Sequence, residues 1–127
     1  GAATRLSRAL RSDPSWWVRY AAVLALGRTK KGFAVPALEE CLRLEPKWQI
    51  RMLAVRSLQD IGGAGAVSAI VKALLDKDSG VRTAAALALG QIGSDDQLPS
   101  LSAALKAETD LSARSAQSSA FRRILSK

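Results

Sequence analysis

The sequence DSGVRTAAALALGQIG, residues 78–93, has two near copies earlier in the chain. DPSWWVRYAAVLALG occupies residues 13–27, and EPKWQIRMLAVRSLQDIG occupies residues 45–62. Each copy contains an arginine after Val or Ile, and a further arginine follows Ala113, so that arginine recurs every 31 or 32 residues: Arg19, Arg51, Arg82 and Arg114. Self-similarity at such a period is typical of repeat architectures, and it divides the 127 residues into four units.

Each unit contains two apolar series with helical spacing. Residues three and seven positions after each arginine share one helix face; they are Ala22, Leu26, Ala54, Leu58, Ala85, Leu89, Gln117 and Phe121. Upstream, apolar residues recur in pairs four apart: Leu6 and Leu10, Leu38 and Leu42, Ile70 and Leu74, Leu101 and Leu105. The spacing predicts first helices at 3–12, 34–44, 66–76 and 98–107, and second helices at 16–28, 48–61, 80–92 and 111–125.

Proline and glycine fit these boundaries. Pro14 and Pro46 fall in the turns inside units, while Pro36 and Pro99 fall in the first turn of a helix, where a missing N–H is harmless. No segment has a strand pattern. A pair of helices cannot bury its apolar faces alone, so the sequence predicts an all-α solenoid of four stacked helix pairs in one domain, 1–127, with units at about 1–31, 32–63, 64–94 and 95–127.

An acidic residue precedes each arginine by six positions in all four units: Asp13, Glu45, Asp76 and Glu108. With the Leu-Gly and Ile-Gly helix ends and the prolines that open first helices, this spacing resembles HEAT-like repeats of the type found in phycobilisome lyase subunits. The resemblance covers essentially the whole chain. It implies that the acids and arginines form a ladder of hydrogen bonds between neighbouring repeats. The fourth unit departs from the pattern, because it is rich in serine and has Gln117 in place of alanine, and its polar surface suggests an end cap.

The composition excludes several functions. The chain has no histidine, which rules out histidine-based acid–base catalysis and histidine-ligated metals. The adjacent carboxylates Asp95–Asp96 and Glu39–Glu40 do not form a catalytic dyad, and GGAG at 62–65 lacks the lysine and hydroxyl of a phosphate-binding loop. We therefore predict a protein that is not an enzyme and needs no cofactor or metal.

The single cysteine, Cys41, permits no intramolecular disulfide. It could serve as a nucleophile or as a bilin attachment point, but the equivalent residues of the other units are Ala9, Ala73 and Ala104, which favours a small buried side chain. No apolar stretch is long enough to span a membrane. We expect a soluble protein in a reducing, intracellular compartment such as the cytoplasm or an organelle stroma or matrix.

Residues one and five positions after each arginine point away from the predicted core, yet several are apolar. The second-helix strip, as we name it, consists of Tyr20, Leu24, Met52, Arg56 and Leu87. In a solenoid it would lie along the concave surface, apolar through three units and polar in the fourth. Such residues suit a protein-docking surface. The structural alternative is that a wide core absorbs the leucines.

Tryptophans stand at the start of two second helices. Trp16 and Trp48 are equivalent in successive units, and Trp17 adjoins the first. These rim aromatics either cover the end of the core between helices or anchor a partner. Unit 3 has Ser79 at this position, so the repeat does not require an aromatic residue there.

The net charge of +8 is concentrated at the N-terminus, where the first 31 residues contain Asp13 as their only acid. The candidate basic patch consists of Arg5, Arg8, Arg11, Arg28, Lys30 and Lys31. It is either a solvated helix face or a surface for an acidic protein, an anionic membrane or nucleic-acid phosphates.

Three functional hypotheses follow. The first is a scaffold or adaptor that binds another protein, possibly acidic, through its concave surface. The second, which rests on the resemblance alone, is a phycobilisome lyase-type or chaperone subunit that presents a bilin or a bilin protein. The third is a nucleic-acid binder that contacts phosphates through the basic first unit. The sequence leaves the oligomeric state open.

Overall fold

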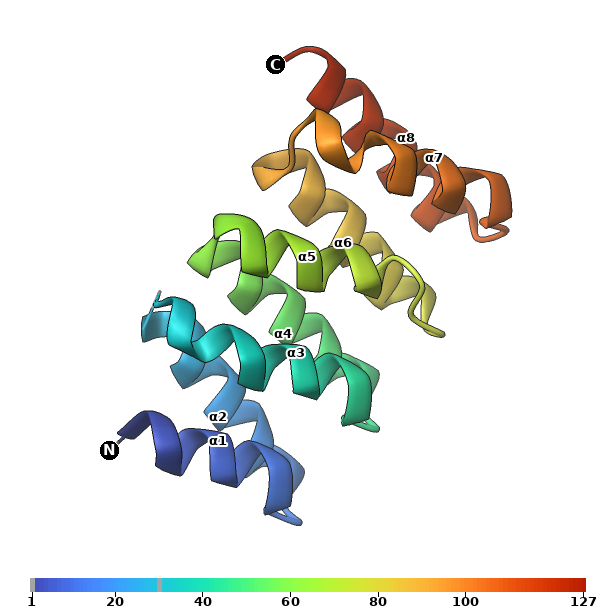
Figure 1. Cartoon of the computed structure of the whole chain (residues 1–127). Coiled ribbons are helices and arrows are strands. Elements are labelled where there is room, and N and C mark those ends of the chain that lie inside the picture. Colours follow the sequence, from blue (N-terminus) through green and yellow to red (C-terminus); the bar gives the residue numbers. More distant parts are fainter. Residues whose placement is uncertain (1, 30) are drawn as a thin grey trace.

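The computed structural model of the chain describes residues 2–29 and 31–127, and its description of side chains omits residues 2, 3, 11 and 12. The described part contains no strand and is built from paired helices: α1 (Ala2–Ser12) with α2 (Trp16–Thr29), α3 (Val35–Leu44) with α4 (Trp48–Ile61), α5 (Gly63–Ala73) with α6 (Ser79–Ile92), and α7 (Leu98–Ala107) with α8 (Leu111–Leu125). The pairs follow one another along a single axis from the N- to the C-terminus (Figure 1). The predicted all-α solenoid is confirmed.

Local sequence explains where the helices begin. Asp78 and Asp110 cap α6 and α8 by accepting hydrogen bonds from Val81 N at 3.1 Å and Ala113 N at 2.9 Å. Pro36 and Pro99 occupy the first turn of α3 and α7. Short 3₁₀ helices, η1 (Gly32–Ala34) and η2 (Asp95–Gln97), lead into these two helices.

The third unit differs from the prediction by one turn of helix. Residues 66–76 were predicted to be helical, whereas α5 spans Gly63–Ala73. Gly62 and Gly63 have φ values of 71° and 86°, so the left-handed break is confined to these two glycines and the helix starts at the second. At the other end the chain leaves the helix at Leu74, and Asp76 becomes part of the turn that leads to α6.

The helices form two rows, and the rows pack differently. Each second helix lies along the next one, α2 on α4, α4 on α6 and α6 on α8, while the first helices touch each other sparsely. Glycines permit this close approach: a Cβ built on Gly90 would lie 3.2 Å from Ala120 Cα, and one built on Gly27 would lie 2.6 Å from Ser57 Cβ. The row of second helices is therefore the more tightly spaced side of the solenoid.

One continuous core runs between the two rows. It contains the predicted leucines and alanines, among them Leu26, Leu58 and Leu89, all with no solvent exposure. Gln117, in place of an alanine, is also fully buried and donates from Nε2 to Glu108 Oε1 at 2.9 Å. Stacking supplies each helix pair with the burial that it could not achieve alone.

Candidate partner-binding surface

Arginine and acid side chains join successive units along the edge where each first helix turns into its second helix. Arg19 Nε donates to Glu45 Oε1 at 2.7 Å, Arg51 Nε to Asp76 Oδ2 at 2.9 Å, and Arg82 Nε to Glu108 Oε1 at 2.8 Å. In each case Nη2 donates to the second carboxylate oxygen, at 2.9 to 3.2 Å. We call each of these arginine–carboxylate pairs a rung of the ladder. All three rungs are bidentate, which gives an arginine–carboxylate pair both strength and a fixed orientation.

Within a unit the acid and the arginine meet through the backbone. Nη1 of each arginine donates to the backbone carbonyl of the acid six residues earlier, at distances of 2.8 to 3.2 Å in all four units: Arg19 to Asp13, Arg51 to Glu45, Arg82 to Asp76 and Arg114 to Glu108. The offset read from the sequence thus marks a backbone contact. The carboxylate that the guanidinium binds belongs to the acid of the following unit.

The rung side chains are largely buried, and pairing shifts the pKa of Arg19, Arg82 and Glu108. The side chains of Arg51 and Asp76 are 4% and 8% exposed. The bond from Arg82 lowers the pKa of Glu108 to about 2, helped by bonds from the Asp110 backbone N and from Gln117. Hydrogen bonds to Glu45 and Glu108 raise the pKa of Arg19 and of Arg82. The guanidinium groups of Arg19, Arg51 and Arg82 thus donate to carboxylates and backbone carbonyls of the chain itself, rather than to an external anion.

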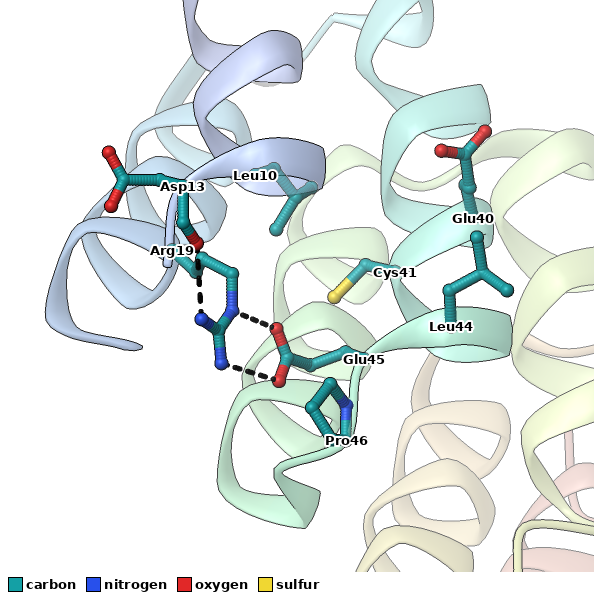
Figure 2. A pocket seen from close by; sticks show the side chains of 8 residues that line it. All are labelled: Leu10, Asp13, Arg19, Glu40, Cys41, Leu44, Glu45 and Pro46. Atoms are coloured by element: carbon teal, nitrogen blue, oxygen red, sulfur yellow. Dashed lines mark hydrogen bonds and ion pairs between the residues drawn. The ribbon is translucent and has the colours of Figure 1, made fainter. Parts of the chain in front are cut away.

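A pocket of about 230 Å³ lies beside the first rung, between units 1 and 2, and Cys41 lines it together with Leu10 and Glu45 (Figure 2). A pocket of about 560 Å³ lies at the equivalent place between units 3 and 4, against Arg82 and Glu108. Because pockets recur at equivalent places of the repeat, we interpret the pocket beside Cys41 as a seam between units. Burial raises the pKa of the Cys41 thiol to about 12, with a further contribution from Glu45, so this sulfur is a poor nucleophile.

The second-helix strip lies on the row of second helices, with graded exposure. Tyr20 is 40% and Leu87 54% exposed, and Arg56 is exposed as well. Leu24 is half-buried. Met52 is half-buried against the core, and its Cε lies 3.6 Å from where a Cβ on Gly80 would stand in the next unit. Tyr20, Arg56 and Leu87 are thus open to a partner, while Met52 also serves packing between units.

The rim aromatics continue this strip toward the turn edge. Trp16, Tyr20 and Leu24 follow one another at intervals of four residues along α2, as do Trp48, Met52 and Arg56 along α4, so each set shares a helix face. Trp16 is 49% and Trp48 42% exposed. Lys47 Nζ lies 5.5 Å from the centre of a Trp16 ring, within cation–π range. Units 1 and 2 therefore present a mixed aromatic and aliphatic surface.

Trp17 points elsewhere although it adjoins Trp16. Its ring centroid lies 6.0 Å from that of Trp16 with an interplanar angle of 87°, and the side chain is 61% exposed. Its equivalent in unit 3 is Gly80, which faces Trp48 of the preceding unit, where a Cβ would be 3.8 Å from Trp48 Cζ3. Trp17 consequently lies on the N-terminal end face of the solenoid.

The charges on the second-helix row are predominantly positive. Asp60 is the one acidic residue within the four second helices, against eight arginines. Three of these are rung donors, and the others include the exposed Arg28 and Arg56. Within the basic patch Arg5, Arg8, Arg28 and Lys31 are exposed, while the side chain of Arg11 and all of Lys30 lie outside the described residues.

Sequence reasoning missed a set of exposed leucines beside the turns inside units. Leu44, Leu75 and Leu111 are 62%, 82% and 83% exposed. Leu44 is the last residue of α3, Leu75 follows the buried Leu74 just beyond the end of α5, and Leu111 opens the last second helix. A search for leucine outside the core register, next to a helix end, could have found them.

The structure shows no group of three His, Cys, Asp or Glu residues that could hold a metal ion in the part of the chain that it describes. Of the helices described, none is long and apolar enough to cross a membrane.

Comparison with known proteins agrees with this geometry. The family model described as HEAT repeats matches residues 2–59 and again residues 35–120. No curated protein matches the chain. Since the two matches together span most of the sequence, and since the stacked helix pairs form the solenoid expected of such repeats, the chain belongs to the HEAT-repeat family.

Proposed function

We propose that this chain is a non-enzymatic scaffold or adaptor that binds an acidic protein segment along its second-helix strip. HEAT repeats are generally protein-interaction scaffolds, which supports a protein partner. The observation that carries the more specific proposal is the exposed row of Trp16, Tyr20 and Leu87 on a helix layer with one acidic residue. Aromatic and arginine side chains dominate the energetics of protein interfaces.

The packing of the two rows supports the placement of the site on the inner side. Closely spaced second helices and sparsely touching first helices make a solenoid bend toward its second-helix row. A curved inner surface lets several units contact one extended or helical partner at once. Trp16 and Trp48, at the same position of successive units, would provide two anchor points on such a partner.

The charge distribution supports an acidic partner. The exposed arginines of the second helices, together with Lys47 and the basic patch, would speed association with a negatively charged segment. The apolar side chains would supply most of the affinity. A partner helix with acidic residues on its flanks and leucine or aromatic residues on its contact face fits both features.

The test uses one substitution on the second-helix strip, one at a rim aromatic and one away from both. Leu87→Glu places a carboxylate on the exposed face of α6, and Trp16→Ser introduces the residue that unit 3 has naturally at this position, Ser79. Leu75→Glu, at an 82% exposed site beside the α5–α6 turn, is the matched control. After affinity capture from the native source with and without nuclease, each captured partner is titrated against all variants.

We expect Leu87→Glu and Trp16→Ser to weaken the partner's affinity at least about tenfold, or roughly 1.4 kcal/mol, with unchanged helicity. Leu75→Glu should bind like the wild type. Equal affinity for all four proteins contradicts the proposal. Binding that vanishes with nuclease, and that falls steeply with added salt, assigns the function to nucleic-acid contact through the basic patch instead.

The narrower assignment to a phycobilisome lyase-type subunit rests on the resemblance of the repeats alone. A thioether-linked bilin would need a reactive thiol, and the Cys41 thiol is buried, with its pKa raised to about 12. A non-covalent bilin complex would be revealed by visible absorbance that comigrates with the protein.

A further inference from the structure

The turn edge is the side of the solenoid where each first helix turns into its second helix. It consists of the turns at 13–15, 45–47, 74–78 and 108–110 with the helix ends beside them. Figure 1 shows these four turns in a row along one side of the molecule. Leu87 of the second-helix strip lies eight residues into α6, about 12 Å along the helix axis from its first residue. The turn edge is therefore a surface separate from the middle of the strip.

The acidic side chains of these turns are bound within the chain. Three accept from the rung arginines and two cap second helices: Glu45, Asp76, Glu108, Asp78 and Asp110. No acidic residue of the four turns is exposed, whereas Lys47 and Lys77 are exposed. The ladder thus removes negative charge from the turn edge, and the charge that the turns present to solvent is positive.

Two leucines protrude from the turn edge at equivalent positions. Leu44 is 62% and Leu75 82% exposed, and each stands seven residues before a rung arginine, Arg51 or Arg82. Units 2 and 3 have a neighbouring unit on both sides, so this exposure is a property of the edge itself. The equivalent residue of unit 4 is Ala107, so the repeat does not require a leucine at this position.

Tryptophan and lysine lie together between the turn edge and the strip. Lys47 Nζ lies 5.5 Å from the centre of a Trp16 ring, and Trp48, 42% exposed, directly follows Lys47. Tryptophan favours the interface between membrane and water, because its ring is apolar and its N–H is polar. Lysine lays its apolar stem along a nonpolar surface while its ammonium group stays among polar groups. These residue types are the ones that meet lipid headgroups.

From this combination we infer that the turn edge binds the surface of an anionic lipid bilayer. Leu44 and Leu75 enter the boundary between headgroups and acyl chains, and Lys47 and Lys77 contact the anionic groups of the lipids. A bilayer accepts two separate protruding side chains, whereas a protein would need a matching hollow for each. Bound in this way, the molecule keeps Leu87 and the rest of the second-helix strip available to a protein partner.

Co-sedimentation with lipid vesicles tests this inference. One set of vesicles contains phosphatidylserine and phosphatidylcholine in equal parts, and the other contains phosphatidylcholine alone. Wild type should bind the anionic vesicles, and its binding to the neutral vesicles should be at least about tenfold weaker. The double variant Leu44→Ala with Leu75→Ala keeps every charge and should bind the anionic vesicles at least about tenfold more weakly. Both leucines are exposed, so this variant should keep the melting temperature of the wild type.

A second pair of variants controls for charge. Leu75→Glu and Leu87→Glu change the net charge equally, at sites that are 82% and 54% exposed. Leu75→Glu should weaken binding to the anionic vesicles at least about tenfold, because a carboxylate then meets the anionic surface. Leu87→Glu, away from the turn edge, should bind the vesicles nearly like the wild type.

An environment-sensitive fluorophore reports which surface meets the lipid. It is attached to Leu75→Cys or to Leu87→Cys in a Cys41→Ala background, since alanine is the residue at the equivalent positions of the other units. On anionic vesicles its emission should shift to shorter wavelength at position 75 and stay unchanged at position 87.

Three results would overturn the inference. The first is a wild type that binds neither kind of vesicle, even if a protein is found to dock on the turn edge. The second is full binding by the Leu44→Ala, Leu75→Ala double variant, which would assign lipid contact to charge alone. The third is a fluorescence shift at position 87 with none at position 75.

Discussion

The rung between units 2 and 3 should contribute far more to stability than Asp13, the acid of unit 1, which forms no rung with the described residues, and one pair of substitutions measures the difference. Asp76→Ala removes the carboxylate that Arg51 Nε and Nη2 contact at 2.9 and 3.1 Å, together with the bond from Asp78 N at 2.9 Å. Asp13→Ala removes the equivalent turn bond, from Ser15 N at 2.9 Å, and no rung. Both variants lose the hydrogen bond within the turn, but only Asp76→Ala also loses the rung.

The magnitude follows from burial. With the Arg51 side chain 4% exposed, Asp76→Ala leaves a buried guanidinium without its counter-ion, which costs about 3 to 5 kcal/mol. The turn bond alone is worth about 1 kcal/mol. For a chain of 127 residues we expect a fall in melting temperature of roughly 10 to 20 °C for Asp76→Ala and roughly 5 °C for Asp13→Ala.

Thermal and urea unfolding followed by far-ultraviolet circular dichroism measures both variants. Because the lost rung joins the two halves of a repeat array, Asp76→Ala should also broaden the transition or split it in two. The double variant Arg51→Met with Asp76→Ala should recover part of the loss, since no buried charge then remains. Equal destabilisation by Asp76→Ala and Asp13→Ala would refute the reasoning, because the rung would then add nothing to the turn.

Three further predictions concern the core and its charges. The pKa of Glu108 falls from 4.5 to about 2 on folding, so this carboxylate contributes on the order of 2 to 3 kcal/mol to the free energy of unfolding. The contribution is present above pH 4.5 and is lost as the pH falls toward 2. Urea unfolding at a series of pH values should show this loss in the wild type and a smaller loss in Glu108→Gln. Gly27→Ala should lower the free energy of unfolding by about 1 to 3 kcal/mol, because the new Cβ would meet Ser57. Adding Ser57→Gly to this variant should restore the stability. Gly32→Ala, with nothing within 4 Å of its Cβ, should leave urea unfolding unchanged. Cys41 should resist alkylation in the native protein at neutral pH and react once the chain is unfolded in guanidinium; labelling at equal rates in both states would contradict its burial.

Most of the fold could be predicted from the sequence, because the signals that mark the start and end of each helix recur in several units of the repeat. Seven of the eight helices begin and end within two residues of their predicted positions. In the third unit the predicted helices 48–61 and 66–76 left the glycines of GGAG, 62–65, outside a helix, but Gly65 lies inside α5, with Val35 Cγ1 3.6 Å from where its Cβ would be. A glycine inside a helix cannot be told from one that ends a helix by its residue type alone.

The surface was less predictable, because exposure and pairing depend on the neighbouring unit. The offset of six residues links Arg51 to Glu45, yet the guanidinium binds the carboxylate of Asp76, a partner that is set by how far one unit is displaced from the next. Likewise, Trp48 lies against Gly80, a residue of the next unit, and remains 42% exposed. The second-helix strip as a binding site stays a prediction.

Site-specific photo-crosslinking tests the central claim most directly. A photoreactive amino acid replaces Leu87, on the second-helix strip, in one protein and Leu75, beside the α5–α6 turn, in another; the two side chains are 54% and 82% exposed. Each protein is irradiated with the captured partner. The proposal predicts a crosslink to the partner from position 87 and none from position 75. A crosslink from position 75 with none from 87 would contradict it and move the binding surface to the exposed leucines of the turn edge.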